Sequence, residues 1–241
     1  MYDIPEGRRA TKGKSIVNFL SLAGEERVTS ILPVSKSAKS TTPYLMLVTR
    51  GGVAKKMSTE SFKDVRRSGI IAIRLDKGDE LESALLVDKG DEIMLATMKG
   101  QSIRFKESDV REMGRTAGGV TAMKFAKNDT LVGVDVIRKD QKDGALLVMT
   151  ANGLGKKTAL KEYKVQKRAG SGIKTAKITP KTGDLIVAKV ITNEEELIAM
   201  SQKGQVIRTE LKSVPSLGRQ TQGVSIMKLR PGDAIASLTC I

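Results

Sequence analysis

The chain has 241 residues, with 42 Lys and Arg against 27 Asp and Glu, and therefore a formal net charge of +15. It contains no His and one Cys, which excludes Ser-His-Asp catalysis, His-ligated metal sites, intrachain disulfides and thiolate zinc clusters. A hydrophobic fraction of 39% is typical of a soluble globular protein, and no apolar run is long enough to span a membrane. Positive charge along the whole length favours a polyanionic partner, most simply nucleic acid.

The chain repeats a motif in which a glycine is followed by alternating apolar residues. Its five copies begin at Gly13, Gly69, Gly119, Gly172 and Gly223. The spacings between these glycines are 56, 50, 53 and 51 residues. A period near 50 over the whole chain indicates stacked or radially arranged units rather than two unrelated domains.

Each unit is predicted to contain four short strands, of which the first begins at the repeat glycine. A turn rich in Gly, Asn and Asp follows, and its carboxylates, such as Asp76 and Asp79, are expected to be solvated. Second strands are predicted at 80–87, 131–137, 185–191 and 234–241. Third strands are predicted at 44–48, 93–96, 145–149 and 197–200. The third strands are almost continuously apolar, which is typical of strands covered on both faces.

The third strand turns through a Gly-containing hairpin into a fourth strand that carries one or two cations, followed by a short polar segment. Four strands in about 50 residues is the pattern of a propeller blade. The sequence therefore predicts an all-β, propeller-like disc of about five four-stranded blades, as one domain over 1–241. The glycine-led halves of its units lie near 7–34, 64–87, 114–137, 166–191 and 218–241. Only four apolar hairpins are present, so either the two ends of the chain share a blade or an upstream piece is absent.

A basic loop of small residues precedes each repeat glycine. Small neighbours let a phosphate approach main-chain N–H groups as well as a cationic side chain. The glycines could merely serve tight turns and the cations merely solvate the loops. Recurrence at one phase of all five units, together with the net charge, favours a phosphate-binding rim instead. The candidate loop cations are Arg8, Arg9, Lys12, Lys14, Arg66, Arg67, Arg115, Lys167, Arg168 and Arg219.

The fourth strands carry a second recurring set of cations. These are Lys55, Lys56, Arg104, Lys156, Lys157 and Arg208. Cations on strands often protect a sheet edge from pairing with other chains, and they can also contact phosphate. The two roles are compatible, and we include these residues among the candidate DNA contacts.

With these motifs in view, the sequence resembles the family of DNA gyrase A C-terminal domains. The segments that carry the resemblance are YDIPE (2–6), KGKSIVN (12–18), SGIIAI (68–73), IRFKESDV (103–110), MGRTAGGV (113–120) and GRQTQGV (218–224). The resemblance covers essentially the whole chain. It implies a β-pinwheel, a propeller-like disc whose blades exchange strands, with duplex DNA bent around its basic rim. The first family repeat, which bears a QRRGGKG box, is not present, and residues 166–172 are the nearest internal match.

The resemblance also implies partners and a setting. It implies a non-catalytic, cofactor-free part of an ATP-dependent type II topoisomerase, which lets the enzyme introduce supercoils. Its partners would be double-stranded DNA, the N-terminal breakage-reunion domain of the same polypeptide and the ATPase subunit, in the cytoplasm at the nucleoid. Two alternatives remain open, the corresponding domain of the related topoisomerase IV and a protein-interaction propeller.

Overall fold

Four antiparallel sheets make up the fold. The computed structural model describes residues 14–15, 18–19, 26–32, 44–62, 69–141 and 143–241. The first sheet, in the order β3-β1-β2-β6, contains β1 (Tyr44–Thr49), β2 (Val53–Ser58), β3 (Leu81–Val87) and β6 (Val120–Thr121). The second, β10-β5-β4-β7, contains β4 (Glu92–Thr97), β5 (Gln101–Lys106), β7 (Leu131–Ile137) and β10 (Ile173–Lys174).

The other two sheets follow the same plan. The third, β11-β8-β9-β14, contains β8 (Ala145–Thr150), β9 (Leu154–Ala159), β11 (Leu185–Ile191) and β14 (Val224–Ser225). The fourth, β13-β12-β15, contains β12 (Glu196–Ser201), β13 (Val206–Glu210) and β15 (Ile235–Cys240). Short 3-10 turns follow the hairpins at η2 (Thr59–Phe62), η3 (Glu107–Asp109), η4 (Leu160–Glu162) and η5 (Leu211–Ser213). The all-β prediction is confirmed, with four sheets in the described residues; the glycine-led half at 7–34 lies largely outside them.

Neighbouring sheets exchange strands. β6 pairs with β2 in the first sheet although β4 and β5 of the second sheet lie between them in the chain. In the same way β10 pairs with β5, and β14 pairs with β9. A later part of the chain thus supplies the outer strand of each of the three four-stranded sheets, which is the pinwheel connection that the resemblance implied.

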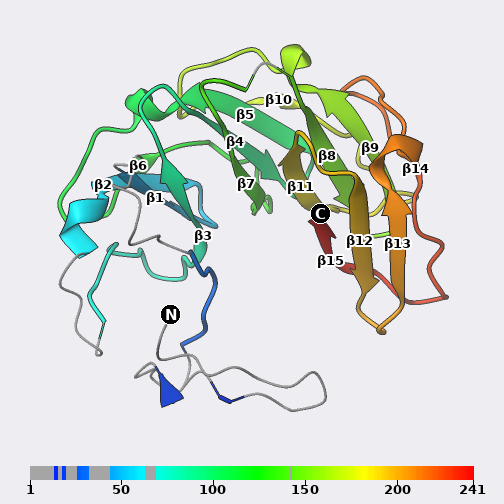
Figure 1. Ribbon diagram of the computed structural model, residues 1–241, viewed down its shortest axis with the longest axis horizontal. Helices are drawn as coiled ribbons and strands as arrows, with labels where there is room; N and C mark the ends of the chain where they lie inside the picture. Colours follow the sequence, from blue (N-terminus) through cyan, green and yellow to red (C-terminus); the bar gives the residue numbers. More distant parts are fainter. Residues whose placement is uncertain (1–13, 16–17, 20–25, 33–43, 63–68, 142) are drawn as a thin grey trace.

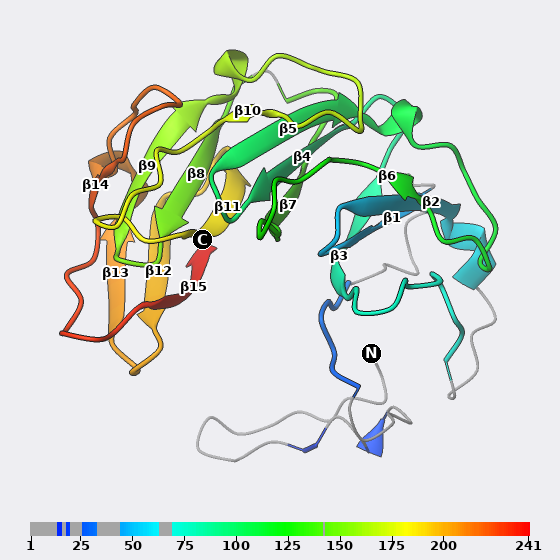
Figure 2. The ribbon, with the colours of Figure 1, turned by 180° about the vertical axis from the view of Figure 1, so that it is seen from behind.

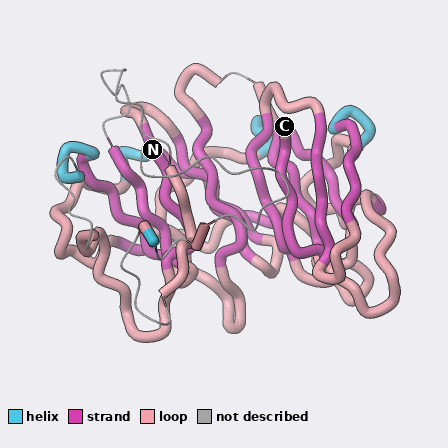
Figure 3. Tube along the Cα trace, turned by 60° about the horizontal axis from the view of Figure 1, so that its bottom comes forward, coloured by secondary structure: helices cyan, strands magenta, loops and turns pink. Residues whose placement is uncertain are grey.

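The four sheets follow an arc (Figures 1 and 2). β3, β7, β11 and β15 line its inner side, where β7 packs against β3 and β11. The donated strands β6, β10 and β14 are the opposite edges of their sheets and lie on the outer side. In Figure 3 the strands stand side by side across the molecule, with turns and loops at both of their ends.

The hydrophobic core lies between consecutive sheets. In β4, Ile93 and Leu95 face the first sheet, and the alternate residues Met94 and Ala96 face the third. β8 divides its residues in the same way between the second and fourth sheets. Because successive side chains of a strand point to opposite faces, a strand with neighbours on both sides must be apolar throughout. The prediction made from the continuous apolar runs is therefore confirmed, and their observed bounds agree to within one residue.

The glycine-led segments form shorter strands than the sequence predicted. In the segments after Gly119, Gly172 and Gly223 only two residues pair with a sheet, and the segment after Gly69 forms no strand in the described residues. The repeat glycine explains the pattern, because a side chain at Gly223 would place its Cβ atom 2.5 Å from the carbonyl oxygen of Gly155, and its φ is +82°. The chain touches the neighbouring sheet at this glycine and then moves on to the next sheet.

The turn carboxylates have a structural role that the sequence analysis missed. The Asp79 carboxylate accepts a hydrogen bond from the backbone N–H of Gly51 at 2.8 Å, in the hairpin that joins β1 to β2. Asp129 accepts from the N–H of Lys99 at 2.9 Å in the second sheet. These carboxylates join two turns of the same sheet, so the expectation that Asp79 is merely solvated was incomplete.

Candidate nucleic-acid interface

Three of the predicted basic loops lie within the described residues, at 114–119, 166–172 and 218–223. Each loop immediately precedes an outer strand, β6, β10 or β14, so all three lie on the outer side of the arc (Figure 1). Because the sheets repeat around the arc, equivalent loop positions recur along one edge. The structure therefore brings these loops to one rim, as their phase in the repeat predicted.

The arginines of the three loops occupy equivalent positions but differ in their partners. Arg115 is exposed, and its guanidinium group makes no hydrogen bond to any described residue. Arg219 is half-buried and donates one hydrogen bond, to the carbonyl oxygen of Lys174 at 3.1 Å. Arg168 donates to the carbonyl oxygens of Asp109 and Thr121, both at 2.8 Å. Arg168 therefore braces its loop.

Next to Arg168, the exposed Lys167 presents the charge of the second loop to solvent. The two neighbouring cations therefore differ in role, since Arg168 holds the loop and Lys167 faces solvent, although the sequence analysis treated them alike.

A further set of exposed cations was missed by the sequence analysis. The residues five positions after the last four repeat glycines are Arg74, Lys124, Lys177 and Lys228, and all four are exposed. None of these side chains forms an ion pair with a residue that the structure describes. The sequence does indicate these residues, because four units carry one cation at the same position of the repeat. They were missed because the segment was expected only to form a strand.

Backbone hydrogen bonds hold three of these four cations beside the basic loops, and Lys228 occupies the equivalent position of its repeat. The N–H of Lys124 donates to the carbonyl oxygen of Gly170 at 3.0 Å, and that of Lys177 donates to Thr221 at 3.1 Å. The N–H of Arg74 makes the equivalent contact with Ala117 at 3.5 Å. Loop cations and strand cations therefore adjoin each other. We call the set the outer basic band, and it comprises Arg74, Arg115, Lys124, Lys167, Lys177, Arg219 and Lys228.

Two of the hairpin lysines are buried, which corrects the expectation that they contact phosphate. Lys55 is 0% exposed, and its ammonium group donates to the carbonyl oxygens of Ala72 at 2.7 Å and Arg115 at 2.6 Å. Lys156 is 1% exposed and donates to the carbonyl oxygens of Gly218 and Arg219 at 2.6 and 2.7 Å. An ammonium group enclosed by carbonyl oxygens cannot reach a phosphate in this conformation.

The adjacent lysines of the same strands are also engaged inside the protein. Lys56 is buried, forms an ion pair with Glu107 and lies 4.8 Å from the centre of the Tyr44 ring. Lys157 donates to the carbonyl oxygen of Leu211 at 2.6 Å, in η5. Both lysines connect a fourth strand to a 3-10 turn. In this conformation they neither contact phosphate nor protect a sheet edge.

The two hairpin arginines form ion pairs with the neighbouring third strand. Arg104 donates to Glu92 at 2.5 Å and to the carbonyl oxygen of Leu160 at 2.9 Å. Arg208 is exposed and donates through Nε to Glu196 at 2.8 Å. Of the six hairpin cations, only Arg208 keeps a largely solvent-facing side chain, and it lies on β13, a sheet edge in the described residues.

Burial sets the electrostatics of the two enclosed lysines. Burial lowers the pKa of Lys55, and it lowers the pKa of Lys156 to about 8. Glu162 opposes the shift at Lys156, because a nearby negative charge favours the ammonium form, and Arg219 adds to the shift. The cost of enclosing a charge is thus substantial, although Lys156 has carbonyl oxygens and the hydroxyl of Thr221, at 3.0 Å, as acceptors.

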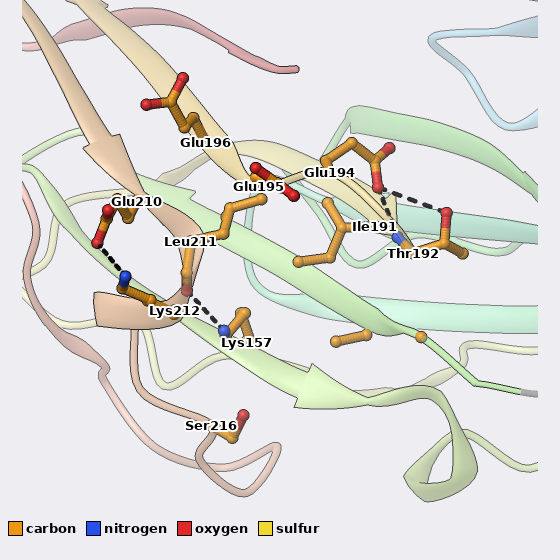
Figure 4. Close-up of a pocket in the computed structure, with 12 residues that line it drawn as sticks. Lys157, Ile191, Thr192, Glu194, Glu195, Glu196, Glu210, Leu211, Lys212 and Ser216 are labelled. Carbon is orange, nitrogen blue, oxygen red and sulfur yellow. Dashed lines mark hydrogen bonds and ion pairs between the residues drawn. The ribbon is translucent and has the colours of Figure 1, made fainter.

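A pocket between the third and fourth sheets is acidic and does not suit a polyanion. Figure 4 shows it lined by Glu194, Glu195, Glu196 and Glu210, with Lys157 and Lys212 engaged by Leu211 and Glu210. No cluster of His, Cys, Asp or Glu fit to hold a metal ion occurs in the part of the chain that the structure describes. The outer basic band is therefore the surface whose charge suits a polyanion.

The remaining predicted site residues belong to the first two loops. Lys14 is exposed. Arg8, Arg9, Lys12, Arg66 and Arg67 lie outside the described residues. No helix among the described residues is long and apolar enough to cross a membrane.

The chain matches the family model described as the DNA gyrase C-terminal domain, beta-propeller, over residues 1–35, 43–88, 91–138, 145–192 and 195–241. It is 39% identical over 239 residues to the DNA gyrase A protein of Mycolicibacterium smegmatis, covering 98% of this chain and 28% of the relative. The corresponding protein of Staphylococcus epidermidis is 36% identical over 237 residues, covering 98% and 26%. The chain thus spans about a quarter of the length of the curated relatives it matches.

Two solved structures share the fold. A DNA gyrase A C-terminal domain matches with a TM-score of 0.81 and 26% identity, over 95% of this chain and 75% of that one. The C-terminal domain of a DNA topoisomerase IV matches with a TM-score of 0.86 but 23% identity, over 95% and 70%, and supports the fold alone. The five matched repeats, the exchanged strands and the gyrase relatives together show that the chain belongs to the family of DNA gyrase C-terminal domains.

Proposed function

We propose that this domain binds duplex DNA along the outer basic band, largely without regard to sequence. The observation that carries the proposal is a row of exposed cations at one fixed phase of the repeat, five residues after successive repeat glycines, beside the cations of the basic loops on the outer side of the arc. Lysine and arginine side chains at regular intervals suit the regularly spaced phosphates of a duplex. The net charge of +15 and the gyrase relatives support the same partner.

The curvature of the band supports bending as well as binding. The outer strands follow an arc (Figure 2), so a duplex that contacts every loop has to curve with it. Bending 20–30 base pairs by 40–90° costs on the order of 1–6 kcal/mol. A few additional charge-assisted hydrogen bonds, at roughly 1.5–3 kcal/mol each, are sufficient to offset that cost.

The proposal extends to the enzyme to which the relatives belong. In it, this domain is an accessory part of a type II topoisomerase that presents bent DNA to the breakage-reunion domain of the same polypeptide. The ATPase subunit is the second protein partner. No catalytic step is assigned to the domain itself, whose role is to supply a curved, positively charged track.

A salt titration of DNA affinity tests the proposal. If roughly eight phosphates are contacted, log affinity should fall with log salt concentration at a slope near −7. Reversing one band charge, as in Arg115→Glu, should weaken binding and make the slope shallower. The matched control is Lys139→Glu, which reverses an exposed charge after the inner strand β7. A wild-type slope shallower than about −2, or equal effects of the two reversals, would reject the band.

A further inference from the structure

Lys55 and Lys156 occupy the same register position in β2 and β9. The residues at that position in β5 and β13 are Ile103 and Ile207. The fold therefore accepts an apolar side chain at this position. Enclosing an ammonium group is energetically costly compared with enclosing an aliphatic chain, so packing alone does not account for the two lysines.

Each buried lysine holds the backbone of one basic loop. Lys55 binds the carbonyl oxygen of Arg115, and Lys156 binds those of Gly218 and Arg219. In a trans peptide group the C=O and the following N–H point in opposite directions, and the described chain contains no cis peptide. The N–H groups of Thr116 and Gln220, which follow the two arginine carbonyls, are therefore turned away from the lysines.

These N–H groups donate no hydrogen bond within the described protein. The second loop provides the contrast. There the position of the lysine is taken by Ile103, and the equivalent N–H group, that of Ala169, donates to the carbonyl oxygen of Ala122 at 2.6 Å. Ala169 also has a φ of +63°. A loop without the buried lysine thus turns this N–H group into the protein, and a loop with it leaves the N–H group free.

We propose that Lys55 and Lys156 are positioning residues, which hold the arginine loops so that the free N–H groups of Thr116 and Gln220 bind a phosphate of duplex DNA together with Arg115 and Arg219. The proposal rests on the DNA binding proposed above and assigns main-chain donors to it. An outward-facing backbone N–H group beside a cation suits an anion. The second loop binds DNA through Lys167 without this contact.

Lys156→Met tests the proposal, because methionine keeps an unbranched apolar chain but removes the ammonium group. The matched control is Lys157→Met, the next residue of the same strand, whose ammonium group binds Leu211 in η5 rather than an arginine loop. Arg219→Ala serves as the reference for loss of a band cation. For each variant, affinity for a duplex of random sequence is measured over a salt series, and amide hydrogen exchange is measured on the free protein.

Lys156→Met is expected to bind about tenfold more weakly, with a salt slope shallower by about one, and to exchange faster in 218–223. Lys157→Met should stay within about twofold of wild type. Wild-type affinity and slope for Lys156→Met, with Arg219→Ala weakened, would overturn the positioning role and leave the band intact. A wild-type protein that does not bind DNA would instead reject the proposed function.

If Lys156→Met does not fold, the wild-type protein supplies a second test. On addition of duplex DNA, the amides of Thr116 and Gln220 should become protected from exchange, and the amide of Ala169 should not change. Equal behaviour of all three amides would overturn the proposal.

Discussion

The carbonyl oxygen of Arg219 lies 2.7 Å from the ammonium nitrogen of Lys156, so a band cation and a buried cation are joined by one peptide group. Under the proposal above, the buried charge acts on the shape of the loop rather than on DNA directly. The loop should then be sensitive to the protonation of Lys156.

Stability and DNA binding should respond to alkaline pH in opposite directions. Burial lowers the pKa of Lys156 from 10.5 to about 8, with Glu162 and Arg219 as its charged neighbours. Between these values the unfolded chain binds more protons than the folded one, so the free energy of unfolding should rise with pH. Over the same interval the amine loses one donor, which should loosen the loop and weaken DNA binding. Both trends are measured against Lys156→Met, in which the contribution of Lys156 is removed and they should be smaller.

The buried ion pair of Lys56 and Glu107 should be important for stability. Their side chains are 8% and 5% exposed, so removing one partner leaves the other charged and enclosed. We expect Glu107→Gln to lower the free energy of unfolding by about 3–5 kcal/mol in chemical denaturation. Glu80→Gln is the control, because its partner Arg50 is 50% exposed and the pair should contribute less than about 1 kcal/mol. Equal losses would contradict the structural role.

Two repeat glycines should differ in their tolerance of alanine. Both Gly69 and Gly223 have positive φ, at +73° and +82°, so alanine is strained by roughly 1–2 kcal/mol at either position. At Gly223 the new Cβ atom would also lie 2.5 Å from the Gly155 carbonyl oxygen, whereas at Gly69 no atom of the described residues lies within 4 Å. Gly223→Ala should therefore reduce thermal stability clearly more than Gly69→Ala. A smaller or equal reduction would show that the exchanged strand β14 is not packed as described.

Bending should be visible in the end-to-end distance of bound DNA. A duplex of about 40 base pairs is well below the persistence length of about 150 base pairs and is nearly straight when free. At saturating protein, energy transfer between dyes on its two ends should increase. Arg115→Glu, tested at a concentration that also saturates binding, should give a smaller increase. Ends that remain as far apart as in free DNA would reject bending and leave a surface that binds straight duplex.

The sequence alone was sufficient for the second, third and fourth strands of the repeat and for their repetition, but it overestimated the strands after the repeat glycines. The continuous apolar runs, such as 93–96, identified strands covered on both faces, because alternation of side chains leaves no other explanation for a strand apolar at every position. The period near 50 placed the basic loops at one phase, and their position on a single rim follows from that phase. The free Arg115 was predicted correctly as an exposed cation.

Only the tertiary structure determined whether each cationic side chain faces the protein interior or solvent. Lys156 and Lys157 are neighbours in a strand, so they point to opposite faces, and other chain segments cover both of those faces. Their acceptors lie 54 to 65 residues away in the sequence, in segments that follow the fourth sheet's hairpin or lead into the donated strand β14. Conversely, Lys124 and Lys177 are exposed because the chain leaves its sheet after two paired residues. The sequence by itself determined where the charges recur, and the long-range exchange of strands determined which of them face solvent.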